Sequence, residues 1–418
     1  LEDKNKKSPI ITASDNEKTE KYGIYAGALG AMYGRNIRLV STDKGLGVKH
    51  EGAIFSERDI VIDSKGDISV GTLNSGDKIN IKGKNLTTTN GSIKINGKDK
   101  EKLVSAKNNI NLNLEENFNL KSLLQSTDGN INIEAKGVTL KEKTSARILT
   151  KNSIALKVTD NLELEKVLIP TVPDTVSKDL IIDKDFKVKN IKSGKIYKDN
   201  EVKWIETGIF GKDIEIYAKT LKNKDIISGE NVSISSDGSI SNDGIVSGDK
   251  NVLIKGKDII NSGIFQSKKD IQIKNNDFLE NDKKILGNSI SIIAKNINNN
   301  DKINAKENIQ INFENTLKNT GEISDQKNII LKGENGKLEN EGQILTKEKI
   351  SIDAKESINK GKLLGKEVNL KVNDNLYNEG SIQAARDLNI VNTGSKNTLL
   401  KGELKTGGSI GLDSQKSE

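Results

Sequence analysis

Cysteine is absent from the 418 residues of the chain, and aromatic residues make up only 3% of it. The lack of cysteine excludes disulfides, thiol catalysis and thiolate metal sites. The scarcity of aromatic side chains argues against a large aromatic core. No run of about 18 apolar residues is present, so no transmembrane segment is expected.

A large excess of charge of one sign is also missing. The net charge is +7, from 66 basic and 59 acidic residues that are interspersed along the chain. No basic stripe with interleaved aromatic residues occurs, so we expect no nucleic-acid binding. The chain begins at Leu1 without an initiator methionine or signal peptide. We therefore interpret it as a segment of a longer protein.

A short motif recurs along the second half of the chain. It is a small polar or charged residue followed by aliphatic, any residue and aliphatic, as in the run that starts at Asp213. Further copies start at Asn231, Asn251, Asp270, Ser289, Asn308, Asn328, Lys349, Glu367, Asp387 and Ser409. The ten steps from Asp213 to Ser409 cover 196 residues, a mean period of 19.6.

A second marker, Asn-x-Gly with an aliphatic residue next or one further on, keeps the same period. It starts at Asn242, Asn261, Asn319, Asn340, Asn359 and Asn378. The first motif also occurs, less regularly, at Asn36, Asp59, Lys78, Asn109, Asn130 and Ser153. Two markers with one period predict a repeat architecture.

The alternation of aliphatic residues predicts short strands. Such strands are too short for deep hairpins, and a repeat of about 20 residues holds no crossover helix, so the remaining solution is a chain that coils and stacks parallel strands. We predict an all-β fold, a right-handed parallel β-helix (β-solenoid) with coils of about 20 residues. About nineteen coils spaced ~4.8 Å apart would give a rod of roughly 90 Å. Glycine would stand where a β-carbon obstructs a bend, and stacked asparagines could hydrogen-bond along the rod.

The chain divides into four regions in this interpretation. Residues 1–20 form a disordered polar leader, 21–160 a first β-helix stretch, and 211–418 a regular β-helix. Residues 161–210 are irregular and contain Pro170, Pro173 and Trp204. The step from Ser153 to Asp213 is 60 residues, three repeats in length. The irregular region is either a few atypical coils or a projecting insertion, and a projection would be a place to present a binding surface.

One segment, residues 25–52, resembles filamentous haemagglutinin-type proteins. Its Leu-Gly-x-Met-Tyr stretch at 29–33 leads into an Ile-x-Leu strand at 37–39, then Gly-x-Gly-Val at 45–48 and Gly52. In that family this pattern lies near the end of the N-terminal secretion domain. The downstream repeats are similar to the family's haemagglutinin repeats, so the resemblance covers about residues 22–412.

The resemblance implies a large exoprotein of a Gram-negative bacterium, exported by two-partner secretion through an outer-membrane β-barrel transporter. The expected location is secreted or on the bacterial cell surface. The expected role is an adhesin rod that binds a host-cell or bacterial surface receptor or glycan. An alternative is the stalk of a contact-dependent growth-inhibition toxin.

The sequence offers no candidate catalytic, cofactor-binding or metal-binding residues, so the chain is not expected to be an enzyme. His50, the only histidine, is interpreted as a surface turn residue within Gly-Val-Lys-His-Glu-Gly. A β-helical polysaccharide lyase or glycosidase is the enzymatic alternative, and it needs carboxylates that converge on neighbouring coils. The candidates Asp213, Asp258, Asp270 and Asp387 instead precede strands, as turn residues do.

Overall fold

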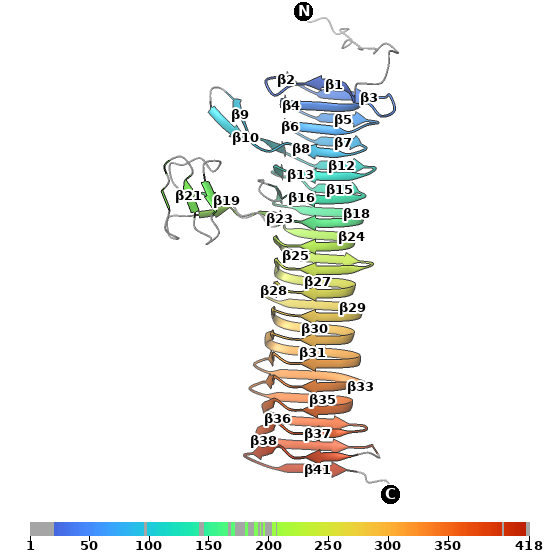
Figure 1. Ribbon diagram of the computed structural model, residues 1–418, viewed down its shortest axis with the longest axis vertical. Helices are drawn as coiled ribbons and strands as arrows, with labels where there is room; N and C mark the ends of the chain where they lie inside the picture. Colours follow the sequence, from blue (N-terminus) through green and yellow to red (C-terminus); the bar gives the residue numbers. More distant parts are fainter. Residues whose placement is uncertain are drawn as a thin grey trace, which may run out of the picture.

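The computed structural model describes residues 21–95, 98–141, 146–165, 207–394 and 397–414, with backbone segments at 169–171, 180–182, 188–190, 193, 195–196 and 203–205. The predicted leader, residues 1–20, lies outside the described residues. The described chain forms strands without any helix, and most strands belong to one 35-stranded sheet that winds into a rod (Figure 1).

The strands of the first part are β1 (Tyr22–Ala26), β2 (Ala31–Gly34), β3 (Ile37–Ser41), β4 (Gly47–Ser56), β5 (Ile60–Ser64), β6 (Ile68–Ser75), β7 (Ile79–Gly83), β8 (Leu86–Thr88), β9 (Ser92–Ile95), β10 (Lys98–Glu101), β11 (Leu103–Ala106), β12 (Ile110–Leu114), β13 (Asn117–Leu120), β14 (Leu123–Ser126), β15 (Ile131–Ala135), β16 (Gly137–Leu140), β17 (Arg147–Thr150) and β18 (Ser153–Leu164). The next are β19 (Ile169–Thr171), β20 (Leu180–Ile182), β21 (Val188–Asn190) and β22 (Lys203–Ile205). The last part holds β23 (Gly208–Phe210), β24 (Asp213–Asn223), β25 (Ile226–Ser236), β26 (Ser239–Asn242), β27 (Ile245–Asn261), β28 (Ile264–Ser267), β29 (Asp270–Asn281), β30 (Lys284–Asn299), β31 (Lys302–Asn319), β32 (Glu322–Ser324), β33 (Asn328–Asn340), β34 (Gln343–Leu345), β35 (Lys349–Asn359), β36 (Lys362–Val372), β37 (Leu376–Asn378), β38 (Ser381–Asn392), β39 (Thr398–Leu400), β40 (Glu403–Thr406) and β41 (Ile410–Ser414).

Each regular coil consists of three short straight segments joined at corners. β31 contains all three, and its parallel pairing with β30 runs from Lys302 to Asn319 with irregularities where the chain turns a corner. All the pairings within the large sheet are parallel, and each coil pairs with the coil before and the coil after it. The predicted parallel β-helix is confirmed.

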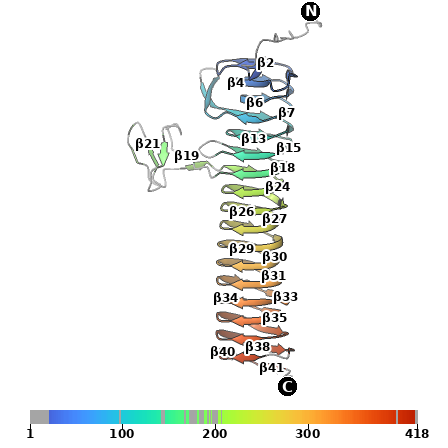
Figure 2. The same cartoon turned by 45° about the vertical axis from the view of Figure 1, so that its right-hand side comes forward.

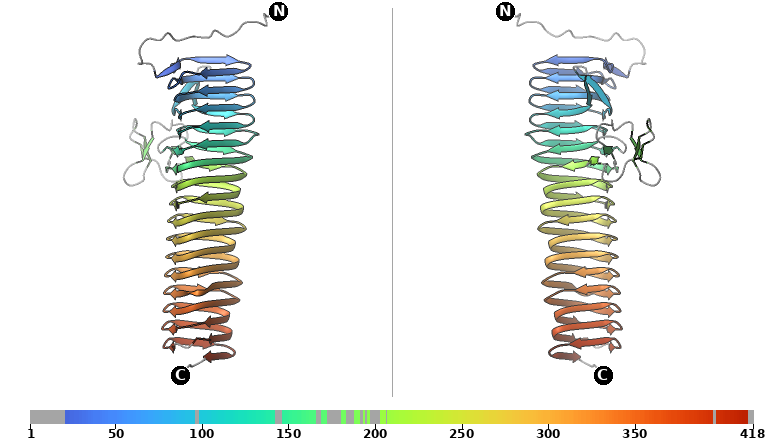
Figure 3. Two further views of the ribbon diagram at one scale, coloured as in Figure 1. Left: turned by 90° about the vertical axis from the view of Figure 1, so that its right-hand side faces the viewer. Right: turned by 90° about the vertical axis from the view of Figure 1, so that its left-hand side faces the viewer.

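The repeated aliphatic residues form continuous columns inside the rod. Ile37 pairs with Ile60 in the next coil, and this column continues through Ile79, Ile110, Ile131, Ile154, Ile214, Val232, Val252, Ile271, Ile290, Ile309, Ile329, Ile350, Val368, Leu388 and Ile410. From Ile60 to Leu388 these side chains are buried. Burial of aliphatic surface at every coil is the main stabilising contribution to such a rod. Figure 3 shows the stack from both sides, without a break between its two ends.

The rod has about 17 turns of roughly 20 residues, two fewer than the nineteen expected from the sequence. The difference arises at the 60-residue step, because Ser153 pairs directly with Asp213 in the adjacent coil. That step therefore adds one turn instead of three, and 17 turns at ~4.8 Å give a rod of about 80 Å.

Two groups of strands lie outside the large sheet. β9 and β10 form an antiparallel pair between β8 and β11. β19 pairs with β22, and β20 with β21, all antiparallel, between β18 and β23. Figure 2 shows β19 and β21 beside the stack. The predicted division of the chain into four regions stays a prediction.

Candidate functional surface

In each coil, the segment that carries the aliphatic column from Ile37 to Ile410 is followed by a second segment. One column of inward-facing residues stands at the end of that second segment. It runs through Ala26, His50, Val70 and Thr88, then Leu120, Leu140 and Leu164, and then a series of asparagines that starts at Asn223. We call it the corner column. The sequence-based interpretation of His50 as a surface turn residue is wrong, because His50 lies within β4 and is fully buried in this column. Burial lowers the pKa of its imidazole.

Asparagines occupy the corner column through nine successive coils of the described chain. They are Asn223, Asn242, Asn261, Asn281, Asn299, Asn319, Asn340, Asn359 and Asn378. All are buried, and the amide Nδ2 of each of the first eight donates to Oδ1 of the next at 2.7–2.8 Å. The predicted hydrogen bonding of stacked asparagines is confirmed. Three members, Asn223, Asn281 and Asn299, have no glycine two residues on, so the Asn-x-Gly marker missed them.

Glycines stand two residues after many of these asparagines, at the same corner, and leave no room for a side chain. A β-carbon on Gly342 would lie 2.0 Å from the carbonyl oxygen of Gly321, and one on Gly361 would lie 1.9 Å from that of Gly342. Neither glycine has a positive φ, so the constraint is space rather than backbone conformation. This confirms that glycine stands where a β-carbon would obstruct the bend. We call this corner, from Thr207 to Gly402, the glycine edge.

An open groove of about 680 Å³ runs along the glycine edge. Its floor is the backbone of Gly321, Gly342 and Gly361. One wall consists of residues that follow the asparagines, namely Asn300, Thr320 and Glu341. The other wall consists of residues that follow the glycines or their equivalents, namely Lys302, Glu322, Gln343 and Lys362. We call this site the glycine groove.

The walls of the glycine groove carry charges of both signs. Lys302 Nζ lies 2.9 Å from Glu322 Oε1, and Thr320 Oγ1 donates to Asn300 Oδ1 at 3.1 Å. The hydroxyl of Ser324 and the ammonium of Lys302 lower the pKa of Glu322, against the effect of burial. The groove is therefore strongly polar but nearly neutral in net charge.

Additional chain segments leave the stack at the same corner in the earlier coils. The β9–β10 pair follows Thr88 of the corner column, and the segment with β19–β22 follows Leu164 of that column. The chain returns at Thr207, whose Oγ1 donates to Asp225 Oδ2 at 2.6 Å. Asp225 stands directly before Gly244 in the column of the glycine edge. Insertions and groove thus share one edge of the rod.

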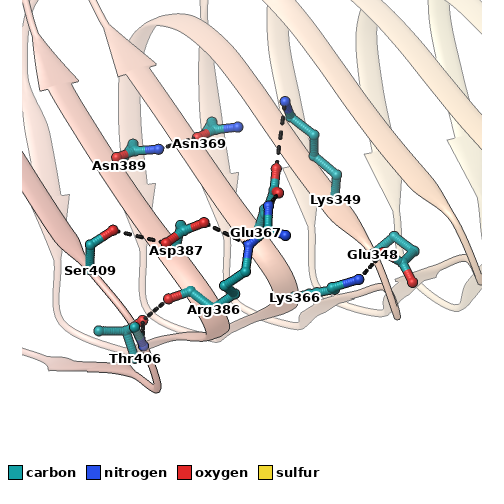
Figure 4. Close-up of polar contacts among 11 residues, drawn as sticks. Glu348, Lys349, Lys366, Glu367, Asn369, Arg386, Asp387, Asn389, Thr406 and Ser409 are labelled. Atoms are coloured by element: carbon teal, nitrogen blue, oxygen red, sulfur yellow. Dashed lines mark hydrogen bonds and ion pairs between the residues drawn. The ribbon is translucent and has the colours of Figure 1, made fainter.

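A different corner carries a ladder of ion pairs (Figure 4). Lys366 Nζ lies 3.0 Å from Glu348 Oε2. Arg386 contacts Asp387 in its own coil and Glu367 in the preceding coil. The hydrogen bond from the Ser409 hydroxyl, and to a lesser extent that from Arg386, lowers the pKa of Asp387. Because these side chains are accessible to solvent, which screens their charges, each pair contributes little to stability. The ladder pairs its own charges instead of offering a patch of one sign.

The carboxylates considered for an enzymatic site do not converge. Asp213, Asp270 and Asp387 share one outward column but are separated by intervening coils. Asp258 begins another segment. In the glycine groove Asp301, Glu322 and Glu341 do lie on successive coils, but Lys302 and Lys362 lie among them, and Lys302 pairs with Glu322. A catalytic acid needs a raised pKa, whereas that of Glu322 is lowered.

The ranges that the structure describes contain no group of three acidic or histidine side chains placed to hold a metal ion. The same ranges contain no helix that could span a membrane.

These features define the class of the protein as a repetitive β-solenoid rod with a polar surface. Over 227 residues, 54% of the chain, it is 30% identical to the protein adenylyltransferase and cysteine protease IbpA of Histophilus somni. Over 64 residues, 15% of the chain, it is 41% identical to the filamentous hemagglutinin of Bordetella pertussis. The matched parts span only 4% and 2% of the length of these relatives.

No family model matches the chain, and no solved structure matches it either. The solenoid and the two similarities support a repeat region that resembles those of filamentous haemagglutinin-type proteins. The activities in the name of IbpA are those of that protein. This chain contains no cysteine and so cannot supply the nucleophile of a cysteine protease.

Proposed function

We propose that the chain is an extracellular rod segment of a large filamentous haemagglutinin-like adhesin that attaches a bacterium to host or neighbouring cells. The observation that carries the proposal is the glycine edge, where a stack of about 17 turns carries a groove and two insertions along one side. A rod holds such surfaces at fixed distances from its ends, which suits attachment. The similarity to the Bordetella hemagglutinin supports this role.

The proposal includes export by two-partner secretion through an outer-membrane β-barrel transporter, and a final place outside the cell or on its surface. The absence of cysteine suits a chain that crosses the periplasm without forming disulfides. The near-neighbour stacking of the coils also suits export, because such a chain can fold coil by coil as it emerges. We propose no catalytic activity for the chain.

A second role, the stalk of a contact-dependent toxin, is favoured by the similarity to IbpA, whose name gives it two activities while the match covers only 4% of its length. In that role the rod would space a toxic domain from the cell surface without binding a receptor itself.

Binding of the purified chain to cells separates the two roles. The folded chain, labelled with a fluorophore, is added to epithelial cells and to bacteria, with heat-unfolded chain as the control. Saturable binding that the unlabelled chain competes supports the adhesin. Binding no stronger than that of the unfolded chain overturns it in favour of the stalk.

A further inference from the structure

We infer that the glycine groove binds an extended, uncharged polysaccharide that lies along the axis of the rod. The inference rests on the proposed adhesive function and assigns a location and a ligand class to it. The groove volume of about 680 Å³ falls within the range of small-ligand sites, about 300–1,000 Å³. It is large enough for a few sugar residues.

The chemistry of the walls disfavours polymers of a single charge sign and apolar chains. A polyanion would meet Glu322 and Glu341, and a polycation would meet Lys302 and Lys362. An apolar peptide would find no aliphatic side chain among the lining residues. Amide, hydroxyl, carboxylate and ammonium groups together offer both donors and acceptors. A chain of sugar hydroxyls, each of which both donates and accepts, fits that mixture.

The floor allows a ligand to approach closely. Without side chains on Gly321, Gly342 and Gly361, a ligand can reach the backbone of three successive coils. The floor amides of Gly321 and Gly342 already donate to the carbonyls of Asn299 and Asn319, at 3.1 and 2.9 Å. Recognition therefore falls to the wall side chains, with the floor supplying contact area.

The groove repeats along the rod with the spacing of the coils. Equivalent wall positions recur every ~4.8 Å, close to the length of one pyranose unit in an extended chain. The glycines continue beyond the groove through Gly380 and Gly402, where Ser381 Oγ and Gln383 Nε2 both donate to Glu403. A linear polymer with one sugar per coil would meet similar groups at each step.

The test compares two double variants of the full chain. Gln343→Ala with Lys362→Ala removes two groove side chains, and Gln272→Ala with Lys274→Ala removes the same residue types from the exposed outer face of β29. Unchanged circular dichroism and melting temperature show that both variants keep the fold. The probes are neutral cello-, chito- and manno-oligosaccharides, heparin fragments and polylysine, titrated by calorimetry and saturation-transfer NMR.

We expect at least one neutral oligosaccharide to bind, with an affinity that rises with its length up to several sugars. The groove variant should weaken this binding at least tenfold, while the outer-face variant should leave it unchanged. Absence of neutral binding, preference for either charged polymer, or equal loss in both variants would overturn the inference. Cell binding that survives in the groove variant would leave the adhesive role standing and refute only this site.

Discussion

Replacing one asparagine in the middle of the corner column tests what its hydrogen bonds contribute. Asn299 accepts from Asn281 Nδ2 and donates to Asn319 Oδ1, both at 2.7 Å. Asn299→Leu removes both bonds, together with the longer contacts of Asn299 Nδ2 with the carbonyl oxygens of Asp301 and Glu322 at 3.3 and 3.2 Å. The substitution keeps the number and branching of the side-chain heavy atoms and leaves no cavity, and leucine already fills the same column at Leu140 and Leu164. The substitution therefore separates hydrogen bonding from the effect of a cavity.

The expected cost follows mainly from the two ladder partners that remain. Asn281 Nδ2 keeps contacts with two carbonyl oxygens at 3.2 and 3.3 Å, whereas Asn319 Oδ1 loses its ladder donor while staying buried. An unpaired buried polar group costs about 1–3 kcal/mol, so one such group and one weakened donor should cost about 2–4 kcal/mol. The matched control is Asn369→Leu, which removes one bond with Asn389 on the accessible outer face and should cost about 0.5 kcal/mol or less.

Hydrogen exchange measured by mass spectrometry is the suitable assay, because a repeat rod opens locally instead of in one global step. The backbone amides of β29 to β33 should lose protection in the Asn299 variant, and those of β24 should not. Equal loss of protection in the Asn299 and Asn369 variants would refute the assignment of stability to the asparagine ladder.

Three further predictions concern the glycine edge, the buried histidine and the charged ladder. Gly342→Ala should lower the free energy of unfolding by about 1–3 kcal/mol or more through overpacking, because its β-carbon would meet the Gly321 carbonyl. The control Gly27→Ala, whose β-carbon would have no atom closer than 3.9 Å, should be neutral, and thermal melts check both variants. Because burial lowers the pKa of His50 in the folded chain, protonation favours the open state. In hydrogen-exchange measurements the protection of β4 should therefore fall as the pH drops below about 6.5, and His50→Val should abolish that dependence. A flat pH profile in the unaltered chain would contradict this. In urea titrations Lys366→Ala should change the free energy of unfolding by less than about 1 kcal/mol, and by still less in 1 M salt. A larger loss that salt does not reduce would show that the ladder is not a simple array of surface ion pairs.

The period and the aliphatic columns could be predicted from the sequence because each coil repeats the same local alternation. Ile214 and Val232 face the core for the same reason, and that reason is visible within four residues. The number of turns could not be predicted by dividing length by period. Whether the 60 residues after Ser153 add one turn or three depends on which strands pair, and that pairing is not local.

The glycines around His50 explain why its position was misjudged. Gly47 and Gly52 resemble turn residues, but a β-carbon on either would meet a backbone oxygen of a neighbouring coil, so these glycines report stacking rather than a turn. The glycine groove escaped prediction for a related reason. Its walls bring together residues about 20 positions apart, such as Lys302, Glu322 and Gln343, and only the register of the coils makes them neighbours.

Deletion of one whole coil tests most directly the claim that the chain stacks interchangeable turns. Removing residues 300–319 joins Asn299 to Thr320 and keeps every column in register, because Asn299 and Asn319 are paired equivalents. Cryo-electron microscopy should then show a folded rod with one rung fewer, shorter by ~4.8 Å, and circular dichroism per residue should be unchanged. Removing only residues 300–309, half a coil, should disrupt the stack at that point. If the twenty-residue deletion disrupts the rod as much as the ten-residue deletion does, the coils are not interchangeable and the account is wrong.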